Sequence, residues 1–188
     1  FNSTVDPEAP AMEDAIGSNK KLFVAGDLRA NENPVLLSIH TLFVREHNRI
    51  CQEIFANDSS LDPSNPADDE YVYQRARKLV GAIIQHITYE EWLPTIGVQV
   101  PDYVGYDETV NPSVSNLFSA VAFRWGHTAI NEIVLRYNVD GSVADYGHIN
   151  LKEAFFNPLE SLRLPLEVYF KGMGVQQMHD LTVNVLHL

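Results

Sequence analysis

One stretch of the chain, residues 122–128, limits what this sequence can fold into, because it places polar groups inside an apolar segment. It reads AFRWGHT and lies within a mostly apolar pattern from about Val114 to Tyr137, preceded by Asn111-Pro112. Asparagine caps helices and proline suits their first position, so the pattern predicts one long helix. Apolar residues on several sides of that helix predict that it is buried.

Three polar residues interrupt this apolar helix, namely Arg124, His127 and Asn131. Their spacing of three and four places them on one face of a helix. Buried polar groups need partners, and a metal at His127 with a negative group near Arg124 would supply them. A core histidine bonded to a backbone carbonyl is the alternative, and the spacing alone leaves both open.

Other parts of the chain also carry helical patterns. Asn33-Pro34 repeats the cap-and-proline signature. The predicted segments are about Pro34–Ala56, about Glu70–Trp92 closed by Pro94, and pieces between Leu151 and Met173 separated at Pro158 and Pro165. Residues 95–112 and a polar linker up to Asn150 are predicted to be irregular. With little strand patterning, the predicted fold class is mainly α.

Length and charge narrow the classes of function. The chain has 188 residues, 45% of them hydrophobic, which allows one domain with a real core. We expect residues 21–188 to form this core and residues 1–20 to form a polar arm or loop. A net charge of −12 argues against nucleic acids and anionic membranes as partners. The sequence shows neither an apolar run long enough for a membrane span nor an N-terminal targeting pattern.

Cysteine, histidine and asparagine motifs give further hypotheses. Cys51 is the only cysteine, so no internal disulfide is predicted, and we expect it to be a small buried apolar residue. His40 and His47 lie seven residues apart, which is conceivable for a metal site, but without a third ligand we favour core histidines. Asn2-Ser3-Thr4 and Asn57-Asp58-Ser59 match the N-glycosylation pattern, which matters only for a secreted protein.

Three blocks of the sequence, in this order, resemble the animal haem peroxidase family, the group of myeloperoxidase, lactoperoxidase and peroxidasin. The blocks are residues 23–49, residues 76–94 and Arg124-Trp125-Gly126-His127. The resemblance covers about Leu22 to about Met173 and implies the helical fold of that family. Catalytic domains of the family are several times longer, so we expect this chain to be a fragment or one processed chain of a larger peroxidase.

The resemblance assigns roles to four residues. Arg29 matches the distal arginine, which stabilises negative charge on the departing oxygen of peroxide. Glu32 matches the carboxylate that forms an ester with a haem methyl group, and His127 matches the proximal ligand of the haem iron. Arg124 matches a position that contacts a haem propionate. The simpler alternatives are a surface ion pair between Arg29 and Glu32, and a salt bridge from Arg124 to a helix neighbour.

Other family features are absent or altered. Asn33 stands where myeloperoxidase has a methionine linked to haem, which argues against efficient chloride oxidation. In the family, the distal histidine, the aspartate of the second haem ester and the calcium loop lie upstream, and the asparagine partner of the proximal histidine lies downstream. Residues 1–20 show no match to the upstream group. We therefore expect the isolated chain to bind haem poorly and to lack general base catalysis.

The resemblance implies an oxidoreductase that carries haem b and uses hydrogen peroxide to oxidise a halide, a pseudohalide or a phenolic or organic donor. It also implies secretion, and it makes the remainder of the peroxidase a partner of this chain. A fatty-acid dioxygenase of the cyclooxygenase branch is the first alternative, although Arg29 and Glu32 favour a covalently linked peroxidase. A catalytically inactive adhesion module on the same scaffold is the second.

Overall fold

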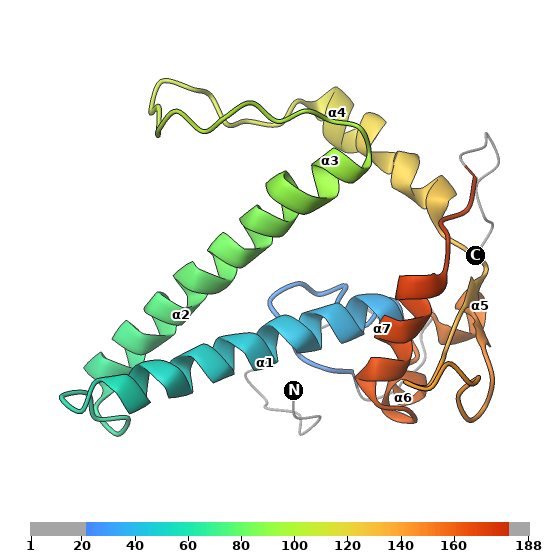
Figure 1. Cartoon of the computed structure of the whole chain (residues 1–188), viewed down its shortest axis with the longest axis horizontal. Coiled ribbons are helices and arrows are strands. Elements are labelled where there is room, and N and C mark those ends of the chain that lie inside the picture. The colour runs from blue at the N-terminus through green and yellow to red at the C-terminus, as the bar shows by residue number, and fades with distance from the viewer. Residues whose placement is uncertain (1–21, 181–188) are drawn as a thin grey trace. The chain divides into compact units, whose positions relative to one another are not determined.

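The computed structural model describes residues 22–180, which are predominantly helical and fall into two compact units. The first unit contains Phe1–Thr41 and Pro112–Leu188, and the second contains Leu42–Asn111. The mainly α fold class is therefore confirmed (Figure 1). The polar arm expected over residues 1–20 lies outside the described residues. Within residues 22–180, none of the helices is both long and apolar enough to span a membrane.

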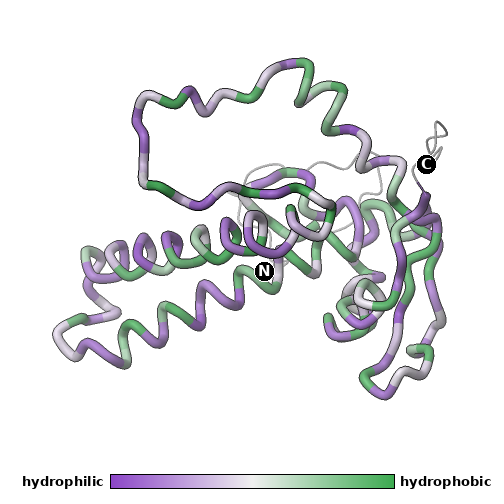
Figure 2. Tube along the Cα trace, turned by 45° about the horizontal axis from the view of Figure 1, so that its top comes forward, coloured by the Kyte–Doolittle hydropathy of each residue, from purple (hydrophilic) through white to green (hydrophobic). Residues whose placement is uncertain are grey.

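The helix predicted from Pro34 is confirmed almost to the residue. It is α1, Pro34–Asn57, and the Asn33 side chain caps it by accepting a hydrogen bond of 2.9 Å from the Leu36 N–H. The helix begins in the first unit and continues into the second. Its residues are hydrophobic and hydrophilic in turn along its length (Figure 2), as the predicted stripe requires.

The next helix begins earlier than predicted. It is α2, Pro66–His86, and its cap is Asn65, whose side chain accepts from the Ala67 N–H at 3.0 Å. Asn65-Pro66 is thus a further cap-and-proline pair, and the predicted start at Glu70 was too late by one turn. The helix continues as a π-helical turn, Ile87–Trp92, and the short α3, Leu93–Thr95. The irregular segment that follows is confirmed.

The long buried helix predicted around His127 is wrong. Two short elements replace it: α4, Asn116–Ala120, and a 3-10 helix, Ala122–Ala129. The first is capped by Ser115, so Asn111-Pro112 is not its start. Phe118 and Phe123 are 49% and 59% exposed. Beyond the 3-10 helix the chain becomes extended, because Ile130 and the residues after it are rich in β-branched side chains.

A small hairpin joins the end of the segment predicted as helix up to Tyr137 to the end of the polar linker predicted up to Asn150. Strand β1, Ile133–Val134, pairs antiparallel with β2, Ile149–Asn150, so that Val134 lies opposite Ile149. Three helices follow: α5, Leu151–Ala154; α6, Pro158–Leu162; and α7, Leu166–Val175. The predicted breaks at the two prolines are confirmed, but the Gly172–Gly174 run lies inside α7 instead of ending it.

The hydrophobic core of the first unit lies where the hairpin meets these helices. Its buried members are Val134, Ile149, Leu151, Ala154 and Tyr169, with Val35 of α1 packed against them. The Tyr169 hydroxyl donates to the Glu160 carbonyl at 2.8 Å, and burial raises the pKa of Tyr169. This core therefore joins the start of α1 to the C-terminal helices.

A buried arginine shapes the hairpin loop. Arg136 is 2% exposed, and its guanidinium donates to the carbonyls of Gly147 and Tyr146 at 2.6 and 3.0 Å. Its charge is offset by Glu160, with 3.7 Å between the charged atoms. Because Glu160 belongs to α6, this ion pair joins the loop to the helical part of the unit.

Candidate functional site

The segment that contains Arg29 is held by a local ion pair. Asp27 accepts hydrogen bonds from the Arg29 backbone N–H at 2.8 Å and from its guanidinium at 3.0 and 2.7 Å. The guanidinium therefore holds the pKa of Asp27 well below its usual range. Arg29 thus pairs with Asp27, not with Glu32 as the surface ion-pair alternative supposed. The pair remains accessible, with 63% of the Arg29 side chain exposed.

Asn31 and Phe156 fix the backbone on either side of Glu32. The Asn31 side chain is 1% exposed; it accepts from the Phe23 N–H at 2.9 Å and donates to the Phe23 carbonyl at 2.8 Å. The Phe156 N–H donates to the Glu32 carbonyl at 2.9 Å. Phe156 adopts a φ of 46°, which is costly for an aromatic residue and is maintained only where the surroundings require it. Asp27, Asn31 and Phe156 were not predicted from the sequence.

Signals for two of these three residues exist in the sequence. An aspartate two residues before Arg29 is placed for a side-chain turn, and an asparagine two residues before the Asn33 cap is a candidate for hydrogen bonding to the backbone. Nothing in the sequence marks Phe156, because its contact joins positions far apart in the chain.

The backbone after His127 is fixed by the residues that follow α7. The Ala129 carbonyl accepts from the His179 N–H at 3.0 Å, and the Asn131 side chain donates to the Gln177 carbonyl at 2.8 Å. His127 itself is exposed, and no ring nitrogen of it is hydrogen-bonded within residues 22–180. The core histidine bonded to a carbonyl is therefore not what the structure shows.

A groove in the first unit is lined by residues that neighbour Glu32 and His127 in sequence, although neither of these two residues lines it. It has a volume of about 290 Å³ and is lined mostly by apolar side chains. Asn33, next to Glu32, forms one wall, and Ala129, two residues after His127, forms another. Both belong to the first unit, as do all four residues assigned by resemblance. Segments almost a hundred positions apart in sequence therefore meet at one place.

Comparisons with known proteins show the family and the fold of this chain. The family model described as animal haem peroxidase matches residues 2–187. The chain belongs to the animal haem peroxidase family. The solved structure of Peroxidase A from Dictyostelium discoideum matches with a TM-score of 0.85 and 34% identity, and the match covers 95% of this chain and 34% of that one.

Several curated animal haem peroxidase relatives share the same segment. The peroxidasin homolog of Mus musculus is 44% identical over 157 residues, which is 81% of this chain and 10% of the relative. Peroxinectin A of Dictyostelium discoideum is 36% identical over 166 residues, or 88% of this chain and 30% of the relative. The chain thus spans about a tenth of the mouse relative and under a third of the other, and it corresponds to part of a larger peroxidase.

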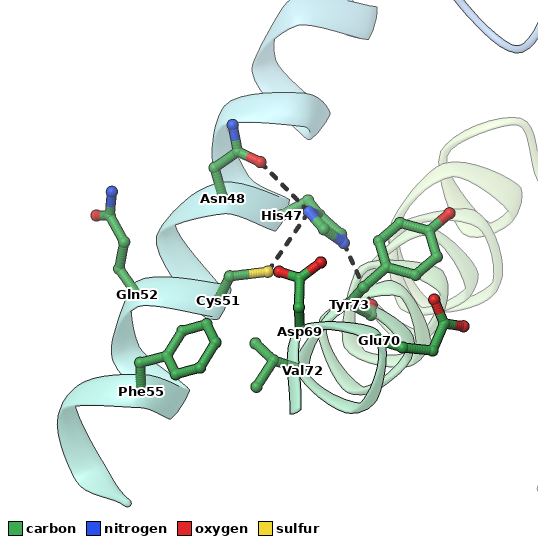
Figure 3. Close-up of a pocket in the computed structure, with 9 residues that line it drawn as sticks. All are labelled: His47, Asn48, Cys51, Gln52, Phe55, Asp69, Glu70, Val72 and Tyr73. Carbon is green, nitrogen blue, oxygen red and sulfur yellow. Dashed lines mark hydrogen bonds between the residues drawn. The ribbon is translucent and has the colours of Figure 1, made fainter. Parts of the chain in front are cut away.

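A second pocket contains His47, one of the two histidines considered as ligands of a metal. It lies in the second unit, between α1 and α2, and has a volume of about 570 Å³ (Figure 3). His47 lies 3.7 Å from the Cys51 sulfur and 3.3 Å from the Tyr73 carbonyl. Among the described residues no three His, Cys, Asp or Glu side chains are grouped to hold a metal. His47 thus has partners from the protein itself, but it is only half-buried and does not belong to the core as the core-histidine interpretation supposed.

Cys51 in the same pocket is half-buried rather than fully buried. Burial raises the pKa of its thiol, and the nearby Asp69 carboxylate adds to that shift. A raised pKa keeps the sulfur protonated at neutral pH and lowers its reactivity. This supports the prediction that Cys51 is a small structural residue.

Proposed function

We propose that this chain is the part of a haem peroxidase that carries the distal arginine and the proximal histidine. The complete enzyme uses hydrogen peroxide to oxidise a halide, a pseudohalide or a phenolic donor. The observation that carries the proposal is the groove lined by Asn33, which follows Glu32, and by Ala129, which ends the 3-10 helix that contains His127. Family membership supports it, because haem is the prosthetic group that gives the family its name.

The chemistry of the side chains that the resemblance assigns suits haem b. The His127 imidazole is exposed and offers a ring nitrogen to iron. Glu32 offers a carboxylate for an ester link, and Arg124 offers a cation for a propionate. Within the described part of the chain, no hydrogen bond or ion pair occupies these three side chains. When bound, haem supplies the redox chemistry, and the protein supplies ligation, orientation and charge.

Arg29 is proposed to stabilise the negative charge that develops as the peroxide O–O bond breaks. A guanidinium remains protonated at any physiological pH and offers directed N–H donors. Asp27 fixes its orientation through the backbone and the side chain together. Such preorganisation lowers the cost of stabilising the developing charge. We assign Asp27 as a positioning residue for Arg29.

The decisive test is an absorption spectrum of the full-length protein with haemin, measured beside His127→Ala and His86→Ala variants. His86 is an exposed histidine of the second unit and serves as the matched control. We expect a sharp Soret band in the wild type and in His86→Ala, and its loss in His127→Ala. A band that survives in His127→Ala would refute the assignment of the ligand. A full-length protein with no specific band would favour the inactive scaffold.

Substrate assays then separate the branches of the family. Oxidation of iodide or a phenol by hydrogen peroxide is expected from the peroxidase. Oxygen uptake with an unsaturated fatty acid would instead support the dioxygenase alternative. We also propose that the protein is extracellular, on the strength of the family resemblance.

A further inference from the structure

The turn that follows α1 carries a motif to which the peroxidase chemistry gives no role. Asn57 is the last residue of α1, and Asp58-Ser59 completes the pattern for N-linked glycosylation. Residues 56–60 are all exposed. The second matching triplet, at Asn2, lies outside the described residues. Asn57 is therefore the site on which the structure gives evidence.

The Asn57 side chain is accessible and only locally held. Its amide nitrogen donates to the Glu53 carbonyl at 2.9 Å, a single bond within the last turn of the helix. Helix ends fray readily, since their last carbonyls lack intrahelical partners. Opening this turn to present the carboxamide to an enzyme disturbs no fully buried residue, because residues 56–60 are exposed and Ile54 and Phe55 are only half-buried.

The hydroxyl that the motif requires is also available. Asp58 accepts from the backbone N–H and the hydroxyl of Ser60, at 3.0 and 2.6 Å, and so closes the turn without Ser59. Within residues 22–180 the Ser59 hydroxyl takes part in no hydrogen bond. Ser60 thus stabilises the turn, whereas the Ser59 hydroxyl is available to the enzyme that recognises the motif.

A similar triplet elsewhere shows that exposure alone does not make a site. Asn111-Pro112-Ser113 is equally exposed, but proline at its middle position excludes it from the pattern. Proline fixes φ and restricts the residue before it, so this asparagine cannot take up the conformation that recognition requires. We therefore expect no glycosylation at Asn111, and this residue serves as a comparison for Asn57 in the same chain.

We propose that Asn57 is glycosylated as the protein passes through a secretory compartment, which rests on the extracellular location proposed above. The co-reactant is an oligosaccharide linked to a polyprenyl diphosphate. The Asn57 amide nitrogen bonds to the anomeric carbon of the sugar and loses one proton. The bond from that carbon to the diphosphate breaks, and the lipid diphosphate leaves. No electrons are transferred.

The test expresses the full-length protein in secreting eukaryotic cells and maps its glycans by mass spectrometry. Enzymatic release of an N-glycan converts the modified asparagine to aspartate, which marks the site in the peptide. We expect this mark at Asn57 in the wild type and in Ser60→Ala, and its loss in Ser59→Ala and Asp58→Pro. Ser60→Ala is the matched control, because it weakens the turn but leaves the motif intact.

The outcomes separate this inference from the proposed function. Haem-loaded protein with unmodified Asn57 in both secreted and intracellular material would overturn the inference and leave the peroxidase proposal standing. A glycan at Asn57 on protein without a Soret band would support the inference and overturn the peroxidase proposal. Loss of the mark in Ser60→Ala as well would show that the turn, not the motif, determines modification, and it would overturn the role given to Ser59.

Discussion

Replacing Gly172 by alanine is predicted to destabilise the first unit, because α7 meets the backbone of the preceding strand region at this position. A Cβ atom at Gly172 would overlap the Leu135 carbonyl oxygen and lie 2.7 Å from the Leu135 carbonyl carbon. Overpacking lowers the free energy of unfolding by up to about 3 kcal/mol, and because the obstacle here is a backbone atom, we expect a cost near this upper value. Alanine returns about 1 kcal/mol through its better helix propensity. The net loss in unfolding free energy is therefore about 2 kcal/mol.

The same contact affects the candidate site. The residue after α7, Gln176, donates to the Ile133 carbonyl at 2.6 Å and accepts from the Leu135 N–H at 3.3 Å. A displacement of α7 would weaken both hydrogen bonds and shift the backbone after His127. We therefore expect Gly172→Ala to weaken haem binding as well as stability.

Thermal and urea unfolding, followed by far-ultraviolet circular dichroism, measure the effect. A loss of about 2 kcal/mol corresponds to a melting temperature lower by roughly 4–8 °C for a chain of this size. Gly174→Ala is the matched control, since it lies in the same helix with no atom within 4 Å of an added Cβ. It is expected to be neutral or slightly stabilising. If Gly172→Ala were as stable as Gly174→Ala, the close contact would not exist in solution.

Two further variants test the segment before α1. Asp27→Asn is expected to slow peroxide reduction by the haem-loaded full-length protein several-fold. This is less than the roughly hundredfold loss expected when a charge-stabilising group itself is removed. An unchanged rate in stopped-flow measurements would rule out the positioning role of Asp27. Because the pKa of Asp27 is lowered from 3.8, its ion pair contributes above pH 3.8 and is lost only as pH falls through the lowered value, so the wild-type rate should show no step from this group between about pH 4 and 8. Asn31→Ala removes two buried hydrogen bonds and should cost about 1–3 kcal/mol in urea unfolding, whereas the exposed Gln52→Ala should have almost no effect; equal midpoints for the two would contradict the role of Asn31.

Helix starts could be predicted where the signal was local. Asn33-Pro34 begins α1 and caps it as expected, because a cap involves only the first turn. The same signature at Asn111-Pro112 does not start a helix, and α4 begins only after the Ser115 cap. A cap helps a helix to form but does not stabilise it by itself, since packing of an apolar face supplies most of the stability. The described residues provide little such packing for the segment that follows Pro112.

Burial and strand pairing could not be predicted, because both depend on partners distant in sequence. The apolar pattern around His127 was identified, but residues such as Leu117, 72% exposed, have no surface to cover them in the described structure. The hairpin of β1 and β2 has two residues on each side, too few for a period of two to show. Its position depends on Gln176, more than forty residues from β1.

Spacing alone singled out Arg124 and His127 but left their role open, and only the resemblance proposed a role for all four site residues. The backbone beside each of these residues is fixed: Asn31 and Phe156 hold the Glu32 segment, and His179 holds the residues after His127. By contrast, the side chains of Glu32 and His127 make no hydrogen bond or ion pair within residues 22–180, so no stabilising contact marks them. A site built to bind a prosthetic group must be rigid in its backbone and unsatisfied in its side chains. Such residues look ordinary in a sequence, and their role follows only from what they are arranged to hold.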